Sequence, residues 1–134
     1  MTIASFDDLL RAAIEQPEPQ RLLFVFATAG VDADATAAQK ARFAAGQGGT
    51  LTPMMCVDKL PRELASFDAL LEESREFDQA WDMVFVAALA GSDGISPSSV
   101  QAEAPLQRMV DAIKSGSIDG FIPFDAQGRP VQFG

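Results

Sequence analysis

The sequence predicts an α/β fold, with α+β as the alternative: a single domain of 134 residues (1–134) with a mixed sheet of about four to five strands packed with helices. Two observations predict it, an internal repeat and an alternation of amphipathic segments with short apolar runs. Residues 5–30 and 66–91 align without gaps and match at 11 of 26 positions, where chance would give about two. Each copy reads as helix then strand. We therefore expect a tandem α-β-α-β duplication with halves at about 5–58 and 66–125.

The helices are expected from caps and apolar spacing. Ser5 can cap the first, whose apolar side chains recur at helical intervals. A Thr-x-x-Gln capping box opens the second, over 36–46. The third covers 61–77, with Ser66 as the alternative point where this segment breaks and is capped afresh. The fourth opens at Pro105, since proline fits the first turn of a helix.

The strands are expected from apolar runs. Residues 22–27 and 83–89 are continuous apolar runs, which are typical of strands buried on both faces. The candidates at 50–57 and 121–124 each contain a proline, which cannot donate to a sheet ladder, so we expect them at the periphery. A closing segment at 131–133 can pair back as a hairpin.

Charge and cysteine content restrict partners and compartment. The net charge is −9 and the basic residues are scattered, so nucleic acid and membranes are not expected partners, whereas a protein partner or a homo-oligomer is. Cys56 is the only cysteine, which indicates a reducing compartment. The start of the chain lacks the pattern of a signal peptide, and no apolar run reaches about twenty residues. We expect a cytoplasmic protein.

The missing residue types exclude most catalytic designs. Histidine is absent, which removes the commonest general base, metal ligand and partner of a nucleophile. Tyrosine is also absent, and a single cysteine cannot form a redox pair or a thiolate zinc site. We lean toward a protein that is not an enzyme, and we expect no cofactor, no metal and no catalytic residues.

Four carboxylates are the candidate ligand-binding residues. Asp58 and Asp125 occupy matching places at strand ends, where a pair of carboxylates brought together could do acid–base work. Asp32 and Asp93 lie in loops that follow buried strands, where open α/β sheets place ligands. The structural alternative is that these residues only shape turns and loops.

Three other features have structural interpretations beside functional ones. Glu72, Glu73 and Glu76 could help to hold a divalent cation or simply form a solvated helix face. The glycine cluster at 46–49 follows a helix and precedes a strand, the reverse of a phosphate-binding loop, so it indicates a helix end. Cys56 is expected to be buried and inert.

Several stretches resemble one known family. They are PEPQRLLFVFA, GGTLTPMMCVDKLPREL, EAPLQRMVDAIKSGSIDGFIPFD and the closing GRPVQFG. The family consists of small uncharacterised proteobacterial proteins that often carry the label ribonucleotide reductase alpha subunit, and the resemblance spans nearly the whole chain. It supplies no catalytic motif. A reductase large subunit uses a radical-bearing cysteine and a cysteine pair, whereas this chain has Cys56 alone, so it lacks the residues of that subunit. The label suggests an accessory chain.

Three functional hypotheses follow. The first is a non-catalytic cytosolic binding or regulatory module with an acidic surface suited to a basic partner. The second is a small-ligand-binding protein or enzyme that uses the strand-end loops with Asp58 and Asp125. The third is an accessory chain of a larger enzyme such as ribonucleotide reductase.

Overall fold

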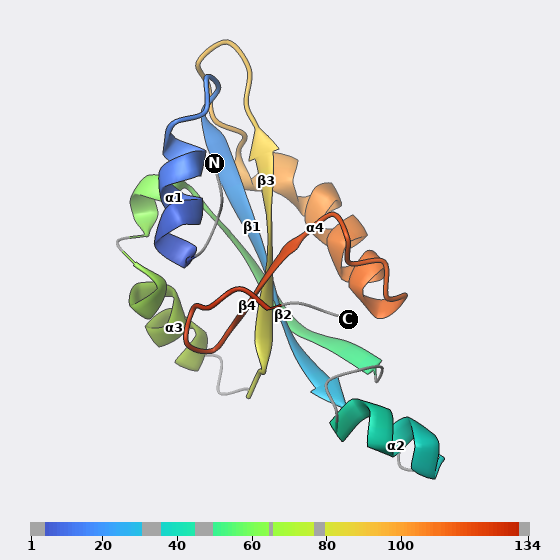
Figure 1. Cartoon of the computed structure of the whole chain (residues 1–134). Helices are drawn as coiled ribbons and strands as arrows, with labels where there is room; N and C mark the ends of the chain where they lie inside the picture. Colours follow the sequence, from blue (N-terminus) through green and yellow to red (C-terminus); the bar gives the residue numbers. More distant parts are fainter. Residues whose placement is uncertain (1–4, 31–35, 45–49, 65, 77–79, 132–134) are drawn as a thin grey trace.

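The computed structural model describes residues 5–30, 36–44, 50–64, 66–76 and 80–131 (Figure 1). In these ranges four strands and four α-helices alternate along the chain, which confirms the predicted fold class in its α+β form. The helices are α1 (Phe6–Ile14), α2 (Ala37–Ala44), α3 (Phe67–Arg75) and α4 (Ser99–Lys114), with one 3-10 turn, η1 (Pro61–Glu63). The strands are β1 (Gln20–Gly30), β2 (Thr50–Lys59), β3 (Met83–Ala90) and β4 (Ile122–Asp125).

The sheet has the strand order β2-β1-β3-β4, and its three neighbouring pairs are all antiparallel. The two apolar runs are the central strands and the two proline-bearing strands are the edges, as predicted. The expectation of a mixed sheet is wrong for the described strands. In Figure 1 α2 lies beyond the ends of β1 and β2 and does not carry the chain back across the sheet, so β2 starts where β1 finishes.

The edge strand β2 contains an irregularity beside its proline. Phe26 of β1 lies opposite Met55, whereas the next residue, Ala27, lies opposite Pro53. Met54 is therefore an extra residue in β2, a β-bulge. Beyond it the pairing is regular up to Lys59.

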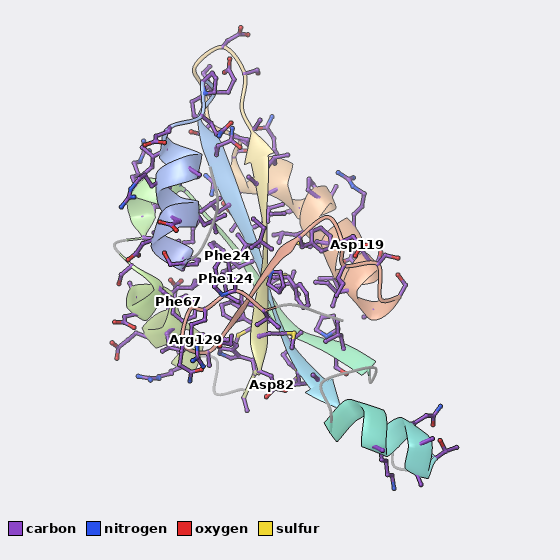
Figure 2. The ribbon with its side chains drawn as sticks, in the orientation of Figure 1. Phe24, Phe67, Asp82, Asp119, Phe124 and Arg129 are labelled. Carbon is purple, nitrogen blue, oxygen red and sulfur yellow. The ribbon has the colours of Figure 1, made fainter. Side chains whose placement is uncertain are left out.

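The helices α1 and α3 cover one face of the sheet around a group of aromatic rings. Phe6 of α1 is 2% exposed, and its ring centroid lies 5.2 Å from that of Phe67 on α3. The same ring lies 6.1 Å from Phe24 of β1 and 5.4 Å from Phe124 of β4. Figure 2 labels these three partners of Phe6. One side chain thus joins both helices to a central and an edge strand.

The helix α4 covers the opposite face. Its buried side chains recur at helical spacing and pack on β1 and β3; they are Ala102, Leu106, Met109 and Ile113. The prediction that this helix opens at Pro105 is wrong, since it begins six residues earlier and Pro105 lies inside it. The side chain of Ser98 accepts from the N–H of Gln101, and Gln101 accepts from the N–H of Ser98. This capping box fixes the start despite the proline.

The segment 61–77 is not one helix. Its described residues form η1 and then α3, which is capped by Ser66, so the alternative with a break at Ser66 is correct. Trp81 packs against Phe26 at 4.9 Å and donates to Ser74 of α3. The structure therefore places Trp81 against the core.

The two halves share their order of elements but not a gapless correspondence. Ser5 and Ser66 both cap helices, and Phe6 and Phe67 pack against each other. In the strands, however, Phe24 faces α1 and α3, whereas its counterpart Phe85 faces α4. Because successive strand residues point to opposite faces, the gapless alignment that matches the two helices does not match the faces of the two strands.

Candidate functional site

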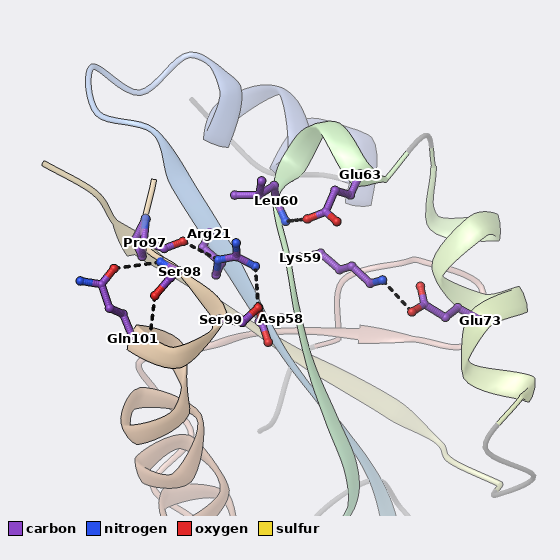
Figure 3. A network of polar contacts seen from close by, with 10 residues as sticks. All are labelled: Arg21, Asp58, Lys59, Leu60, Glu63, Glu73, Pro97, Ser98, Ser99 and Gln101. Atoms are coloured by element: carbon purple, nitrogen blue, oxygen red, sulfur yellow. Dashed lines mark hydrogen bonds and ion pairs between the residues drawn. The ribbon is translucent and has the colours of Figure 1, made fainter. Parts of the chain in front are cut away.

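The end of β2 carries a cluster of polar side chains from three different elements. Asp58 lies 2.5 Å from the guanidinium of Arg21 and accepts from the hydroxyl of Ser99 at 2.6 Å (Figure 3). Arg21 also donates to the carbonyl of Pro97 at 2.6 Å. The side chains of Arg21 and Asp58 are 12% and 18% exposed. This cluster joins the start of β1, the end of β2 and the first turn of α4.

A second ion pair lies on the other side of the same strand. Lys59, the next residue after Asp58, is 2.7 Å from Glu73 of α3. Successive strand residues point to opposite faces, so Asp58 contacts α4 and Lys59 contacts α3 (Figure 3). The strand end is therefore tied to a helix on each face of the sheet.

Asp125 shapes a turn at the end of β4. Its carboxylate accepts from the backbone N–H of Gln127 at 2.8 Å and of Arg129 at 3.0 Å, and from the Arg129 side chain at 3.0 Å. Burial alone would raise the pKa of Asp125, but these hydrogen bonds and the charge of Arg129 together have the larger, opposite effect. The pKa of Asp125 therefore lies below the usual 3.8. The carboxylate is held in its ionised form.

The depressed pKa of Asp125 predicts a pH-dependent contribution to stability. Because the folded pKa is the lower one, the contribution is complete above the ordinary aspartate pKa and is lost as the pH falls through the folded value. Asp125→Asn keeps an oxygen that can accept from the backbone but removes the titration. We expect the stability difference between the natural chain and Asp125→Asn to shrink below about pH 4, measured by urea unfolding from pH 3 to pH 7. A difference that is constant over this range would contradict the role of the charge.

The structure does not bring Asp58 and Asp125 together. They lie on opposite edge strands, in register with Ala87 and Met83 of β3 respectively. Three strand spacings and four residues along the strand put them roughly 20 Å apart. A joint acid–base pair is therefore not formed by these two carboxylates.

The other predicted carboxylates lie elsewhere. Asp93 is exposed in the loop between β3 and α4, with a backbone φ of 53°. It lines a hollow of about 400 Å³ together with Gly91, Ser96 and Gln101. Asp32 lies outside the described residues.

Gly91 makes the close approach on which this loop depends. A Cβ at Gly91 would lie 2.0 Å from the carbonyl oxygen of Ile95 and 3.0 Å from that of Pro19. We expect Gly91→Ala to destabilise the fold by about 1–3 kcal/mol, because backbone atoms must move. Gly30, its counterpart in the first half, has no atom within 4 Å of such a Cβ, so Gly30→Ala is the matched control. Equal melting temperatures for the two variants would contradict the packing described.

The glutamates of α3 do not form a cation site in the described structure. Glu73 pairs with Lys59, and Glu72 lies 4.0 Å from Arg75. Within the described ranges, no group of three acidic or cysteine side chains is placed to hold a metal ion. The glycine cluster at 46–49 lies outside those ranges.

Cys56 is exposed, and the expectation that it is buried is wrong. It lies opposite Val25, on the α4 side of an edge strand, where no neighbouring strand covers it. Met54, also on β2, is 36% exposed. The apolar sequence around Cys56 reflects strand formation more than burial.

Sequence reasoning missed the two partners of Asp58. Arg21 stands immediately before the apolar run that forms β1, and a basic residue there can reach a carboxylate at the end of a neighbouring strand. Ser99 follows the capping residue of α4. Both signals existed, but only the strand pairing shows that the three side chains meet.

Comparison of the chain with models of protein families, with curated proteins and with solved structures found no match in any of the three. Among the residues described, none of the helices combines the length and hydrophobicity that a membrane crossing needs. The resemblance noted in the sequence stays a prediction.

Proposed function

We propose that this chain is a non-catalytic cytosolic module that binds or regulates another protein. One observation carries the proposal: Asp58 and Asp125, the two carboxylates expected to do acid–base work, are both hydrogen-bonded within the fold. Asp58 is held by Arg21 and Ser99, and Asp125 is held by its own turn. A group that fastens elements of the fold is not free to bind or transform a substrate.

The serine in the cluster is not arranged as a nucleophile. The Ser99 hydroxyl donates to Asp58, and the same carboxylate oxygen accepts from Arg21. An activated serine needs a neighbouring base that is free to take its proton, most often histidine, which this sequence lacks. The cluster supports an anchoring role for Ser99 at the start of α4.

Affinity purification of the tagged chain at native expression tests this proposal. Recovery of a stoichiometric protein partner that binds again when both are purified supports it. Recovery of reductase subunits in that role would favour an accessory chain of that enzyme. Recovery of the chain alone, or of copies of itself only, contradicts a module for another protein.

The hollow beside Asp93 supports a second candidate, a small-ligand site in the loop between β3 and α4. It has about 400 Å³ and combines backbone, hydroxyl and amide groups with the Asp93 carboxylate. A thermal-shift screen with metals, nucleotides and small acids tests it, because a ligand that binds only the folded state raises the melting temperature. If no compound shifts the melting temperature, this candidate fails.

A further inference from the structure

We propose that the outer edge of β2 receives an extended, basic segment of the partner protein as an added strand. This inference rests on the proposed function and names where and how the partner binds. In this mode backbone hydrogen bonds supply affinity, and alternate side chains of the partner supply specificity. The described strand order ends at β2, so its outer side has no neighbouring strand in that part of the chain.

The hydrogen bonds of β1 show which groups of β2 point outward. The carbonyls of Pro19 and Ala27 accept from Gly91 and Asp82, on the β3 side. Because the direction alternates along a strand, the odd-numbered residues of β1 bond to β3 and the even-numbered ones bond to β2. The residues of β2 that lie opposite the even-numbered residues of β1 are Met55, Val57 and Lys59. Their backbone groups therefore bond to β1.

The intervening residues of β2 present their backbone to the outer edge. Cys56 and Asp58 each direct an N–H and a C=O away from β1. Among the described residues, no backbone hydrogen bond from a loop, turn or cap occupies these groups. They form a regular docking site for a short antiparallel or parallel segment.

Pro53 agrees with this assignment and limits the site. It lies opposite Ala27, an odd-numbered residue, so its nitrogen, which has no hydrogen, also faces outward. Proline and a bulge are the usual means of protecting a sheet edge. Here they protect the first part of β2, up to Met54, and leave the part from Met55 to Lys59 open.

The charge of the chain favours a basic occupant over a second copy of itself. Two copies would each bring a net charge of −9 to the contact, whereas a basic segment is attracted. Glu103 is exposed on α4 one turn after Ser99, which donates to Asp58, so it adds a negative charge on the helix that packs against the end of β2. Exposed Met54 and Cys56 offer apolar contact to side chains of the added strand.

The substitution Cys56→Pro tests the proposed site at the outer edge of β2. The probe is a labelled peptide, Lys-Thr-Val-Lys-Val-Thr-Lys, and its counterpart with glutamate in place of lysine. Cys56→Pro removes an N–H that points away from β1, so the hydrogen bonds between β1 and β2 are kept. Cys56→Ser keeps this N–H and is the control. We expect the natural chain and Cys56→Ser to bind the basic peptide, and Cys56→Pro to bind it at least about tenfold more weakly. Thermal unfolding confirms that each variant is folded.

A second measurement uses the natural chain alone. Cys56 is its only thiol and lies at the proposed site, so the basic peptide should slow alkylation of Cys56 and the acidic peptide should not. Equal binding of the basic peptide by Cys56→Pro and Cys56→Ser, equal binding of the acidic and basic peptides, or unchanged alkylation would each overturn the inference. A purified partner that binds Cys56→Pro as tightly as the natural chain would overturn this site alone, whereas absence of any partner would overturn the proposed function.

Discussion

Replacing Phe6 with alanine should lower the free energy of unfolding by about 3–5 kcal/mol. Phe6 is 2% exposed and contacts rings from α3, β1 and β4, so truncation leaves a cavity where these three elements meet α1. The surrounding rings cannot close this cavity without moving the helices. Urea unfolding followed by circular dichroism measures the loss. A loss of this size is a large part of the stability of a small domain.

The control for this variant is Val100→Ala. Val100 is also on a helix but is 74% exposed, so we expect a change within about 0.5 kcal/mol. If the two variants lose the same stability, the aromatic group is not the centre of the core that the structure shows.

The second large effect is expected at the ion pair between Arg21 and Asp58. Removing either side chain leaves a mostly buried charge without its partner, so Arg21→Ala and Asp58→Ala should each cost about 2–3 kcal/mol. The double variant should cost little more than either single variant, because the two side chains act as a unit. A double-mutant cycle in urea measures this coupling. Two losses that simply add would contradict the contact.

The control pair lies on the surface of α3. Arg75 and Glu72 are 4.0 Å apart and are 69% and 82% exposed. Exposed pairs contribute little, so Arg75→Ala should change stability by less than about 0.5 kcal/mol. Raising the salt concentration should reduce the small contribution of the exposed pair more than that of the pair at Arg21, which water screens less.

Local signals predicted most of the elements. The apolar runs gave both central strands, and Pro53 and Pro123 marked both edge strands. These inferences succeed because a continuous apolar run and a proline without an N–H can both be recognised in the segment itself, without knowledge of its neighbours in the fold. The start of α4 differs from the predicted one at Pro105 because the capping box at Ser98 satisfies two backbone groups, whereas the proline removes one hydrogen bond.

Contacts distant in sequence could not be predicted in the same way. Asp58 was singled out, but its pairing with Arg21 depends on the register between β1 and β2, which the sequence leaves open. The alignment of the two copies matches Phe24 with Phe85, whereas the structure places these two side chains on opposite faces of the sheet. Cys56 was expected in the core because its neighbours are apolar, and only the position of β2 at the edge shows that it is exposed.

Hydrogen exchange of the β2 backbone, measured residue by residue, tests the open edge most directly. In the free chain, the N–H groups of Met55 and Val57 should exchange slowly because they bond to β1, and those of Cys56 and Asp58 should exchange quickly. Addition of the basic peptide should slow exchange at Cys56 and Asp58. Slow exchange at these two residues in the free chain would mean that the edge is already occupied, and would contradict the account.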